Sequence, residues 1–95
     1  MCELEGSPKQ VAWATEIRQE VIKKMQEYIR QYIAANKPGR AEVLSQGLPK
    51  LLSKKNQASW WIDRRYDKPA VWEATIERLV PAEEIYKKYG EVWIF

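Results

Sequence analysis

Histidine is absent from this 95-residue chain, and cysteine occurs once, as Cys2. A structural zinc ion is held by four ligands that are mostly cysteine or histidine, so a conventional zinc site within one chain is excluded. A single cysteine also excludes an internal disulfide and is typical of a reducing compartment. We therefore expect a cytoplasmic protein without a metal site.

Catalytic patterns are equally scarce. Without histidine the chain lacks the commonest general base, and it contains no G-x-S-x-G, P-loop or H-E-x-x-H pattern. The adjacent acids Glu83 and Glu84 follow Pro81 at the start of an expected helix, where acidic side chains usually complement the helix dipole. We predict that the protein is not an enzyme and uses no cofactor.

Long apolar runs are also lacking, because no stretch approaches the roughly 20 apolar residues that cross a bilayer. Charged residues make up 31% of the chain and hydrophobic residues 45%, which is ordinary for a folded globular protein. A chain of this length suits one domain with a modest core. We expect a single helical domain over residues 1–95 and no membrane partner.

The stretch from Pro8 to Asn36 predicts one long amphipathic helix. Ser7 stands at the N-cap, Pro8 at the first helical position and Gln10 at the third, which is a capping-box pattern. No glycine or proline follows before Pro38. At 100° per residue one line of the helix is apolar or aromatic. Its members are Ala14, Ile17, Val21, Met25, Tyr28 and Tyr32.

The predicted length of this helix carries a second inference. At roughly 1.5 Å per residue it spans about 43 Å, whereas a compact chain of this size has a radius of gyration of roughly 12 Å. Either the fold is elongated, or the helix kinks, or its end at Tyr28–Ile33 meets a partner. Because its apolar sector exceeds the roughly 100° of a one-sided surface helix, we expect two elements to pack on it.

The remaining chain predicts shorter helices. Gly47 and Pro49 indicate a break inside the next helical stretch, Asp67 resembles an N-cap, and Gly90 a left-handed C-cap. We expect helices at about 40–46, 49–54, 57–66, 68–80 and 82–89, and an extended tail at 91–95. The fold class is therefore mostly α, a long N-terminal helix with three or four shorter helices packed across it and an extended C-terminal tail.

The net charge of +3 is unevenly placed. Residues 37–68 carry eight lysines and arginines against three acids, a net charge of +5, so the rest of the chain carries −2. Within that segment Lys50 and Lys54 are one helical turn apart, and Lys55 follows. These lysines form either a solvated face or, together with nearby arginines, a phosphate-binding face whose affinity would fall steeply with salt.

The adjacent pair Trp60 and Trp61 lies in the same basic segment. Neighbouring helical residues point about 100° apart, so one interpretation places one ring in the core and the other at its edge. The other interpretation exposes one ring beside cations, where it stacks on an unpaired base or anchors a protein interface. The candidate binding residues are Lys50, Lys54, Lys55, Trp60, Trp61, Arg64, Arg65 and Lys68.

Two stretches together resemble small, largely uncharacterised bacterial and phage-borne domains. EGSPKQVAWATEIR at residues 5–18 is similar to their E-x-x-G-S-x-K-Q-x-x-W-A-x-x-I-R type helix, and SWWIDRR at 59–65 to their later x-W-I-D-x-R helix. The resemblance implies a phage or mobile-element context. It carries over no site residues.

Three hypotheses for function follow. In the first, the protein binds a protein partner in nucleic-acid-handling or host-defence machinery through its basic, Trp-bearing 50–68 region, as an anti-CRISPR-like inhibitor would. In the second, the same face binds nucleic acid directly. In the third, the helix ends and the tail at 91–95 build a homodimer.

Overall fold

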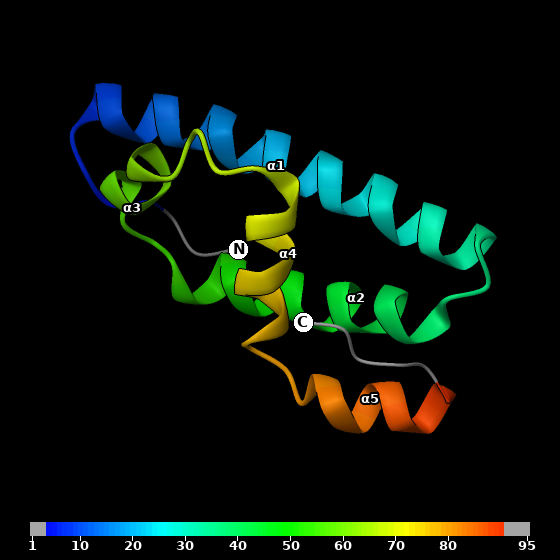
Figure 1. Ribbon diagram of the computed structural model, residues 1–95. Coiled ribbons are helices and arrows are strands. Elements are labelled where there is room, and N and C mark those ends of the chain that lie inside the picture. The colour runs from blue at the N-terminus through cyan, green and yellow to red at the C-terminus, as the bar shows by residue number, and fades with distance from the viewer. Residues whose placement is uncertain (1–3, 91–95) are drawn as a thin grey trace.

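The computed structural model describes residues 4–90 and contains five α-helices (Figure 1). They are α1 (Pro8–Ala34), α2 (Pro38–Lys54), α3 (Ala58–Asp63), α4 (Pro69–Glu77) and α5 (Ala82–Tyr89). Within that part of the chain no strand forms, and the mostly α fold class is confirmed. The tail expected at 91–95 lies outside the described residues.

α1 begins at the capping box that the sequence predicts. The Gln10 backbone N–H donates to Ser7 Oγ at 3.2 Å, and the Ser7 N–H donates to Gln10 Oε1 at 3.1 Å. The two bonds satisfy two donors that every helix start leaves open. The helix ends two residues earlier than expected, because Asn36 adopts a left-handed backbone conformation with φ of 59°.

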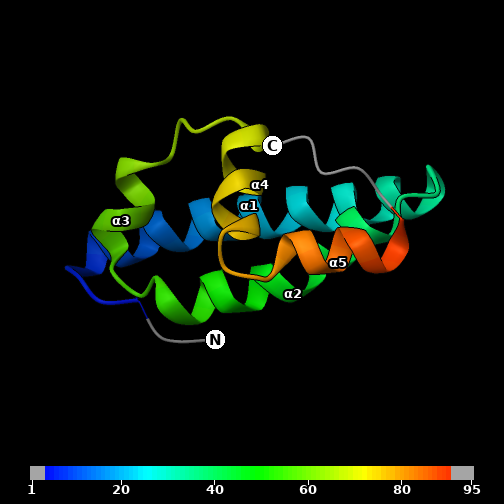
Figure 2. The ribbon, with the colours of Figure 1, turned by 60° about the horizontal axis from the view of Figure 1, so that its bottom comes forward.

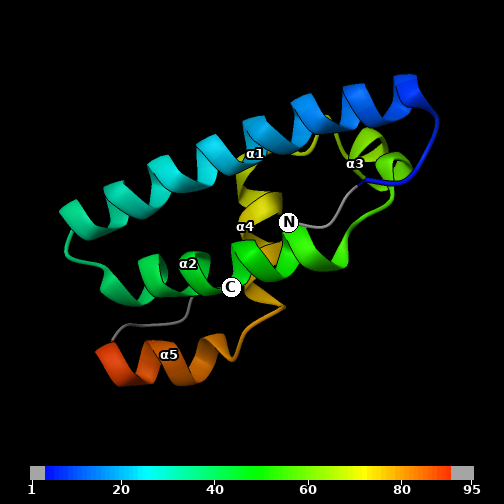
Figure 3. The same cartoon turned by 180° about the vertical axis from the view of Figure 1, so that it is seen from behind.

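The molecule is elongated, with a radius of gyration of 14.1 Å and extents of 45 × 22 × 20 Å. The first of the three explanations for the long helix is therefore correct. α2 and α3 both pack along α1, which confirms that its wide apolar sector receives two elements. In Figures 1 and 3, α4 crosses between α1 and α2, and α2 lies between α1 and α5. α5 thus packs on α2.

The predicted break at residues 47–49 is wrong, since α2 runs without interruption from Pro38 to Lys54. Packing against α4 requires a glycine at position 47. A Cβ there would collide with the Ile76 side chain and lie 2.8 Å from the Ile76 carbonyl oxygen. Pro49 costs one backbone hydrogen bond. The buried leucines on both sides of it hold the helix together regardless, namely Leu44, Leu48, Leu51 and Leu52.

Two other helices are shorter than the sequence predicts. The stretch 57–66 is helical only over Ala58–Asp63, and 68–80 only over Pro69–Glu77. Lys68, not Asp67, is the N-cap of α4, and no side chain caps it. α4 gives way to turns before Pro81, because a proline disfavours the α conformation of the residue before it. α5 has its predicted bounds and ends on Gly90, with φ of 68°.

The larger core cluster joins α1, α2, α3 and α4 around two tryptophans. Trp61 is fully buried and stacks on Trp72, with ring centroids 5.6 Å apart and planes 17° from parallel. The Trp61 indole N–H donates to the Lys55 carbonyl at 2.8 Å, so its polar atom is satisfied. A smaller cluster packs α5 on α2 and consists of Val43, Val80, Ala82, Ile85 and Tyr86.

Residues before α1 hold α3 in place. Leu4 is buried in the larger core, and Glu5 forms a single parallel bridge with Gln57. The Glu5 N–H donates to the Asn56 carbonyl at 2.7 Å, and the Ala58 N–H donates to the Glu5 carbonyl at 2.8 Å. The short helix α3 is thereby anchored from two sides. In Figure 2, α3 and α4 lie on the same side of the α1–α2 pair.

Candidate interaction surface

The two adjacent tryptophans of α3 have different environments. Trp61 lies inside the core, so its ring is unavailable to a partner. Trp60 is half-buried and meets Trp61 and Trp72 edge-on, at centroid distances of 5.0 and 5.7 Å. One ring is thus core and the other packs at its edge. The contacts among Trp60, Trp61 and Trp72 stabilise the packing of this corner of the fold.

Trp60 is also covered by cations of its own chain. The Arg64 guanidinium carbon lies 4.4 Å from the ring centroid, and the Lys55 ammonium lies 5.4 Å from it, both within the range of a cation–π contact. Arg64 Nη1 also donates to the Trp60 carbonyl at 3.4 Å. Arg64 therefore occupies a position from which a nucleic-acid base would stack on this ring.

The remaining predicted lysines do not gather around Trp60. Lys50 Nζ donates to the Leu79 carbonyl at 3.4 Å, which directs it to the end of α4. Lys54 is exposed in the last turn of α2, and Lys68 is exposed at the N-cap of α4. From the predicted set, the structure therefore brings Lys55, Trp61 and Arg64 into contact with Trp60.

Arg65 organises a second cluster that the sequence analysis did not find. Its guanidinium carbon lies 4.9 Å from the centroid of Trp13 and 4.6 Å from that of Tyr66. Trp13 is 47% exposed and Tyr66 84% exposed. We call Trp13, Arg65 and Tyr66 the α1–α3 patch. The available signal was Trp13 itself, a large aromatic residue outside the buried line of α1.

The geometry of the two arginines follows from the end of α3. A helix leaves its last carbonyls without intrahelical partners, and α3 has only six residues. Arg65 Nη1 donates to the Ile62 carbonyl at 2.6 Å, beside the contact of Arg64 with the Trp60 carbonyl. Cations at this end also face the negative end of the helix dipole. Both guanidiniums are therefore positioned before any partner arrives.

Acidic residues are interleaved with these cations. Asp63 and Asp67 flank the arginine pair in sequence, and Glu16 lies one turn after Trp13 on α1. Within the described residues neither Arg64 nor Arg65 forms an ion pair. The surface is thus of mixed charge, with cations that remain available to a partner's carboxylates or carbonyls.

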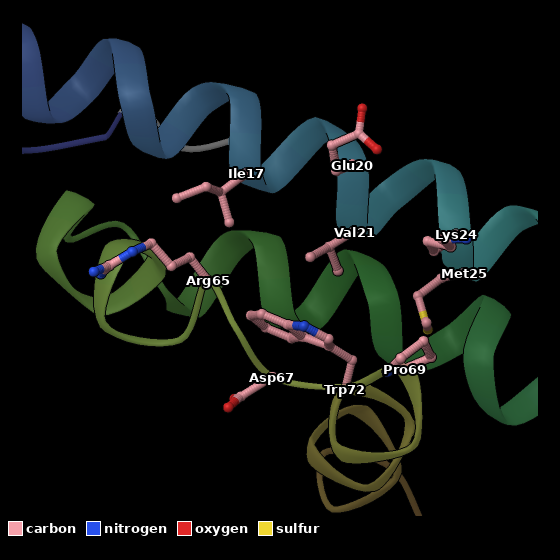
Figure 4. A pocket seen from close by; sticks show the side chains of 9 residues that line it. All are labelled: Ile17, Glu20, Val21, Lys24, Met25, Arg65, Asp67, Pro69 and Trp72. Carbon is pink, nitrogen blue, oxygen red and sulfur yellow. The ribbon is translucent and has the colours of Figure 1, made fainter.

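A pocket of about 260 Å³ opens next to the α1–α3 patch, between α1 and residues 65–72 (Figure 4). Its apolar lining consists of Ile17, Val21, Met25, Pro69 and Trp72. Its charged lining consists of Glu20, Lys24, Arg65 and Asp67. A second hollow of about 410 Å³ lies between α1 and α2, lined by Ile22, Gln26, Leu48, Pro49, Leu52 and Ser53.

A polar cluster at the C-terminal end of α1 holds helices together. The Tyr32 hydroxyl donates to Glu73 Oε1 at 2.7 Å, and Arg40 Nη1 lies 3.5 Å from the same hydroxyl. Burial raises the pKa of Tyr32, and the hydrogen bond to Glu73 raises it further. The phenol therefore stays protonated and ties α1 to α4.

No group of three histidine, cysteine, aspartate or glutamate side chains in residues 4–90 is placed to hold a metal ion. In the same part of the chain no helix combines the length and the apolar character needed to cross a membrane. No protein-family model, curated protein or solved structure matches this chain.

Proposed function

We propose that this protein is a non-enzymatic binding module that docks on a protein partner through the surface around α3. The observation that carries the proposal is the α1–α3 patch, in which one arginine is held between two exposed aromatic rings. Tryptophan, tyrosine and arginine are the residue types that dominate the energy of protein interfaces. Here all three residue types occur at one site, with the arginine in contact with both rings.

Three features favour a protein partner over nucleic acid. Phosphate binding is favoured by clustered lysines and arginines, but Asp63 and Asp67 flank the arginine pair in sequence and Lys50 donates to the Leu79 carbonyl. Base stacking requires an open aromatic face, but Arg64 and Lys55 both lie against Trp60, the ring that the sequence suggested for that role. A mixed surface with preorganised arginines is better suited to the carboxylates and carbonyls of a protein.

The resemblance to phage-borne domains supports a partner in nucleic-acid-handling or host-defence machinery. An anti-CRISPR-like inhibitor that occupies a surface of its target would be one protein of this kind. The homodimer hypothesis rests on different residues, the helix ends and the tail at 91–95, and among them Ile33 at the end of α1 is 62% exposed. It predicts a mass that depends on concentration.

The test is capture of a partner from host-cell lysate by the tagged chain, with matched variants. Tyr66→Ser removes an exposed ring that touches Arg65, and Tyr89→Ser removes the corresponding exposed ring on α5, which touches Lys88. We expect the captured protein to bind wild type and Tyr89→Ser equally. Binding by Tyr66→Ser or Arg65→Ala should fall about 30-fold, the effect of losing a hot spot.

Equal capture by all variants would contradict the proposal. Binding of short oligonucleotides that weakens log-linearly with salt would establish the nucleic-acid alternative instead. A monomer that becomes a dimer with concentration, independently of Tyr66, would establish the assembly alternative.

A further inference from the structure

We propose that the α1–α3 patch binds a carboxylate of the partner, an aspartate or glutamate side chain that bonds to Arg65 beside the rings of Trp13 and Tyr66. This inference rests on the proposed function and specifies the residue type that the docking surface recognises. The patch is suited to a carboxylate by its hydrogen-bond donors, by the aromatic contacts of Arg65 and by the lack of an acid paired with that guanidinium.

The patch is rich in hydrogen-bond donors. Arg65 and the Trp13 indole carry N–H donors and no acceptor, and the Tyr66 hydroxyl can donate as well. Arg65 Nη1 donates to the Ile62 carbonyl at 2.6 Å. Within residues 4–90 the other N–H groups of Arg65, the Trp13 indole N–H and the Tyr66 hydroxyl donate to no protein acceptor. The matching ligand supplies acceptors, and an ionised carboxylate is the side-chain group that only accepts.

Two aromatic contacts position the guanidinium of Arg65 without using its donors. Its carbon lies 4.9 Å from the centroid of Trp13 and 4.6 Å from that of Tyr66. A ring face is a much weaker acceptor than a carboxylate oxygen, so the N–H groups stay available for a stronger bond. The contacts therefore hold a planar donor fork in place, and such a fork binds a carboxylate through two parallel hydrogen bonds.

The acids close to Arg65 in sequence do not pair with it. Asp63 and Asp67 flank the arginine pair, but neither forms an ion pair with Arg65. In Figure 4 the Arg65 guanidinium and the Asp67 carboxylate extend in different directions. A bidentate bond at contact distance outweighs the screened repulsion of exposed acids farther away.

The same acids disfavour nucleic acid as the source of the anion. Affinity for a nucleic-acid backbone grows with the number of phosphates that lysines and arginines neutralise. At the α1–α3 patch Arg65 is the one cation in contact with the two rings, and acids stand on both sides of the arginine pair in sequence. A single carboxylate requires only one guanidinium, so a protein side chain is the better match.

The experiment needs no partner, because small probes can report the preference. N-acetyl-glycyl-glutamyl-glycine amide, its glutamine counterpart and a short thymidine oligonucleotide are titrated into the isotope-labelled protein at constant ionic strength. Binding is followed by NMR at the Arg65 Nε–H and the Trp13 indole N–H. We expect the glutamate peptide to shift both resonances and to bind roughly two- to fivefold more tightly than the glutamine peptide, as for an exposed ion pair. The oligonucleotide should shift neither resonance.

Matched variants make the test specific. Arg65→Gln removes the charge and should abolish the preference for the glutamate peptide. Arg65→Lys keeps the charge without the planar fork, and should retain only part of the preference. Arg30→Gln changes an exposed arginine of α1 that contacts no aromatic ring of the described residues, and should leave the preference intact. The Trp61 indole N–H, bonded to the Lys55 carbonyl, reports whether α3 stays packed in each variant.

The carboxylate inference fails if the glutamine peptide binds as well as the glutamate peptide, or if Arg65→Gln keeps the preference. It also fails if the oligonucleotide shifts the Arg65 resonance more strongly than the glutamate peptide does. These outcomes are distinct from failure of the proposed function. A captured partner that depends on Tyr66 but binds Arg65→Gln normally would uphold the docking surface and overturn the carboxylate. A glutamate preference at Arg65 without any captured protein partner would uphold the chemistry of the patch and overturn the proposed function.

Discussion

The C-terminal ends of α3 and α5, which we call the two ends, carry similar side chains that differ in their other contacts. On α5, Lys88 lies 5.2 Å from the ring of Tyr89, and after α3, Arg65 lies 4.6 Å from the ring of Tyr66. The Tyr89 hydroxyl donates to Glu42 Oε1 at 2.9 Å, and Lys88 Nζ is 3.6 Å from the same carboxylate. Within the described residues the Tyr66 hydroxyl has no hydrogen bond and Arg65 no carboxylate.

This difference separates a structural contact from the surface that we propose for docking. Tyr89 and Lys88 both bind Glu42 on α2, so their polar groups serve to hold α5 in place. Tyr66 projects into solvent, and its hydroxyl makes no hydrogen bond to another described residue. A partner can therefore bond this hydroxyl, at the entropic cost of ordering an exposed side chain. An exposed aromatic ring beside a cation therefore indicates a binding surface only where the polar groups of the pair have no partners within the protein.

The largest expected effect concerns the cores beneath the two ends. Trp61→Ala removes a fully buried ring and its hydrogen bond, and should cost about 3–5 kcal/mol in the free energy of unfolding. Ile85→Ala lies in the five-residue cluster under α5 and should cost about 2 kcal/mol, at the lower end for such a truncation. Urea unfolding measures both values.

The same pair of variants tests whether the ends are independent. Ile85→Ala should leave the indole resonance of Trp13 unchanged in NMR spectra, because the α1–α3 patch does not touch the smaller cluster. Trp61→Ala should shift it, since Arg65 leaves its position when α3 loses its core contact. A shift in both variants would show that the two ends are coupled.

The features that were predictable from sequence are local ones. The capping box at Ser7, the apolar line of α1 and the glycine stop at Gly90 depend on residues within a turn of one another. The misread break in α2 is different, because glycine at position 47 is required by Ile76, 29 residues further along the chain. No local pattern distinguishes a glycine that ends a helix from one that admits a neighbour.

The candidate surface was predictable only in part for the same reason. Charge counting treated residues 50–68 as one face, but the structure divides them among α2, α3 and the start of α4. The α1–α3 patch joins Trp13 to residues more than 50 positions later. Such a contact depends on how α3 packs on α1, which composition and spacing do not specify. For Trp60 and Trp61 the sequence left two alternatives open, and the structure shows the first, with Trp61 in the core and Trp60 at its edge.

A smaller effect should distinguish the two exposed tyrosines directly. Tyr89→Phe deletes the hydroxyl that donates to Glu42 and should lower the free energy of unfolding by about 0.5–1.5 kcal/mol, the net value of one hydrogen bond. Tyr66→Phe deletes a hydroxyl without an internal partner and should change stability by less than about 0.5 kcal/mol. Equal losses in urea unfolding would remove the distinction on which the docking surface rests.

The smallest effect is confined to alkaline pH and concerns Tyr32, which, like Tyr89, is bonded to a carboxylate. Its pKa is raised in the folded state by burial and by Glu73. The folded protein therefore holds this proton more tightly than the unfolded chain does. The stability linked to it is fully present below the ordinary tyrosine pKa of about 10 and is lost as pH rises above that value.

The wild type should consequently lose stability relative to Tyr32→Phe between pH 9 and pH 11. Unfolding in urea at both pH values measures the change, and the comparison with the variant cancels the titration of the lysines and of the other tyrosines. A stability difference that is the same at both pH values would mean that the Glu73 contact does not retain the phenolic proton. Tyr32 would then resemble the solvent-facing Tyr66, and bonding to a carboxylate would no longer set apart the tyrosines that hold the fold together.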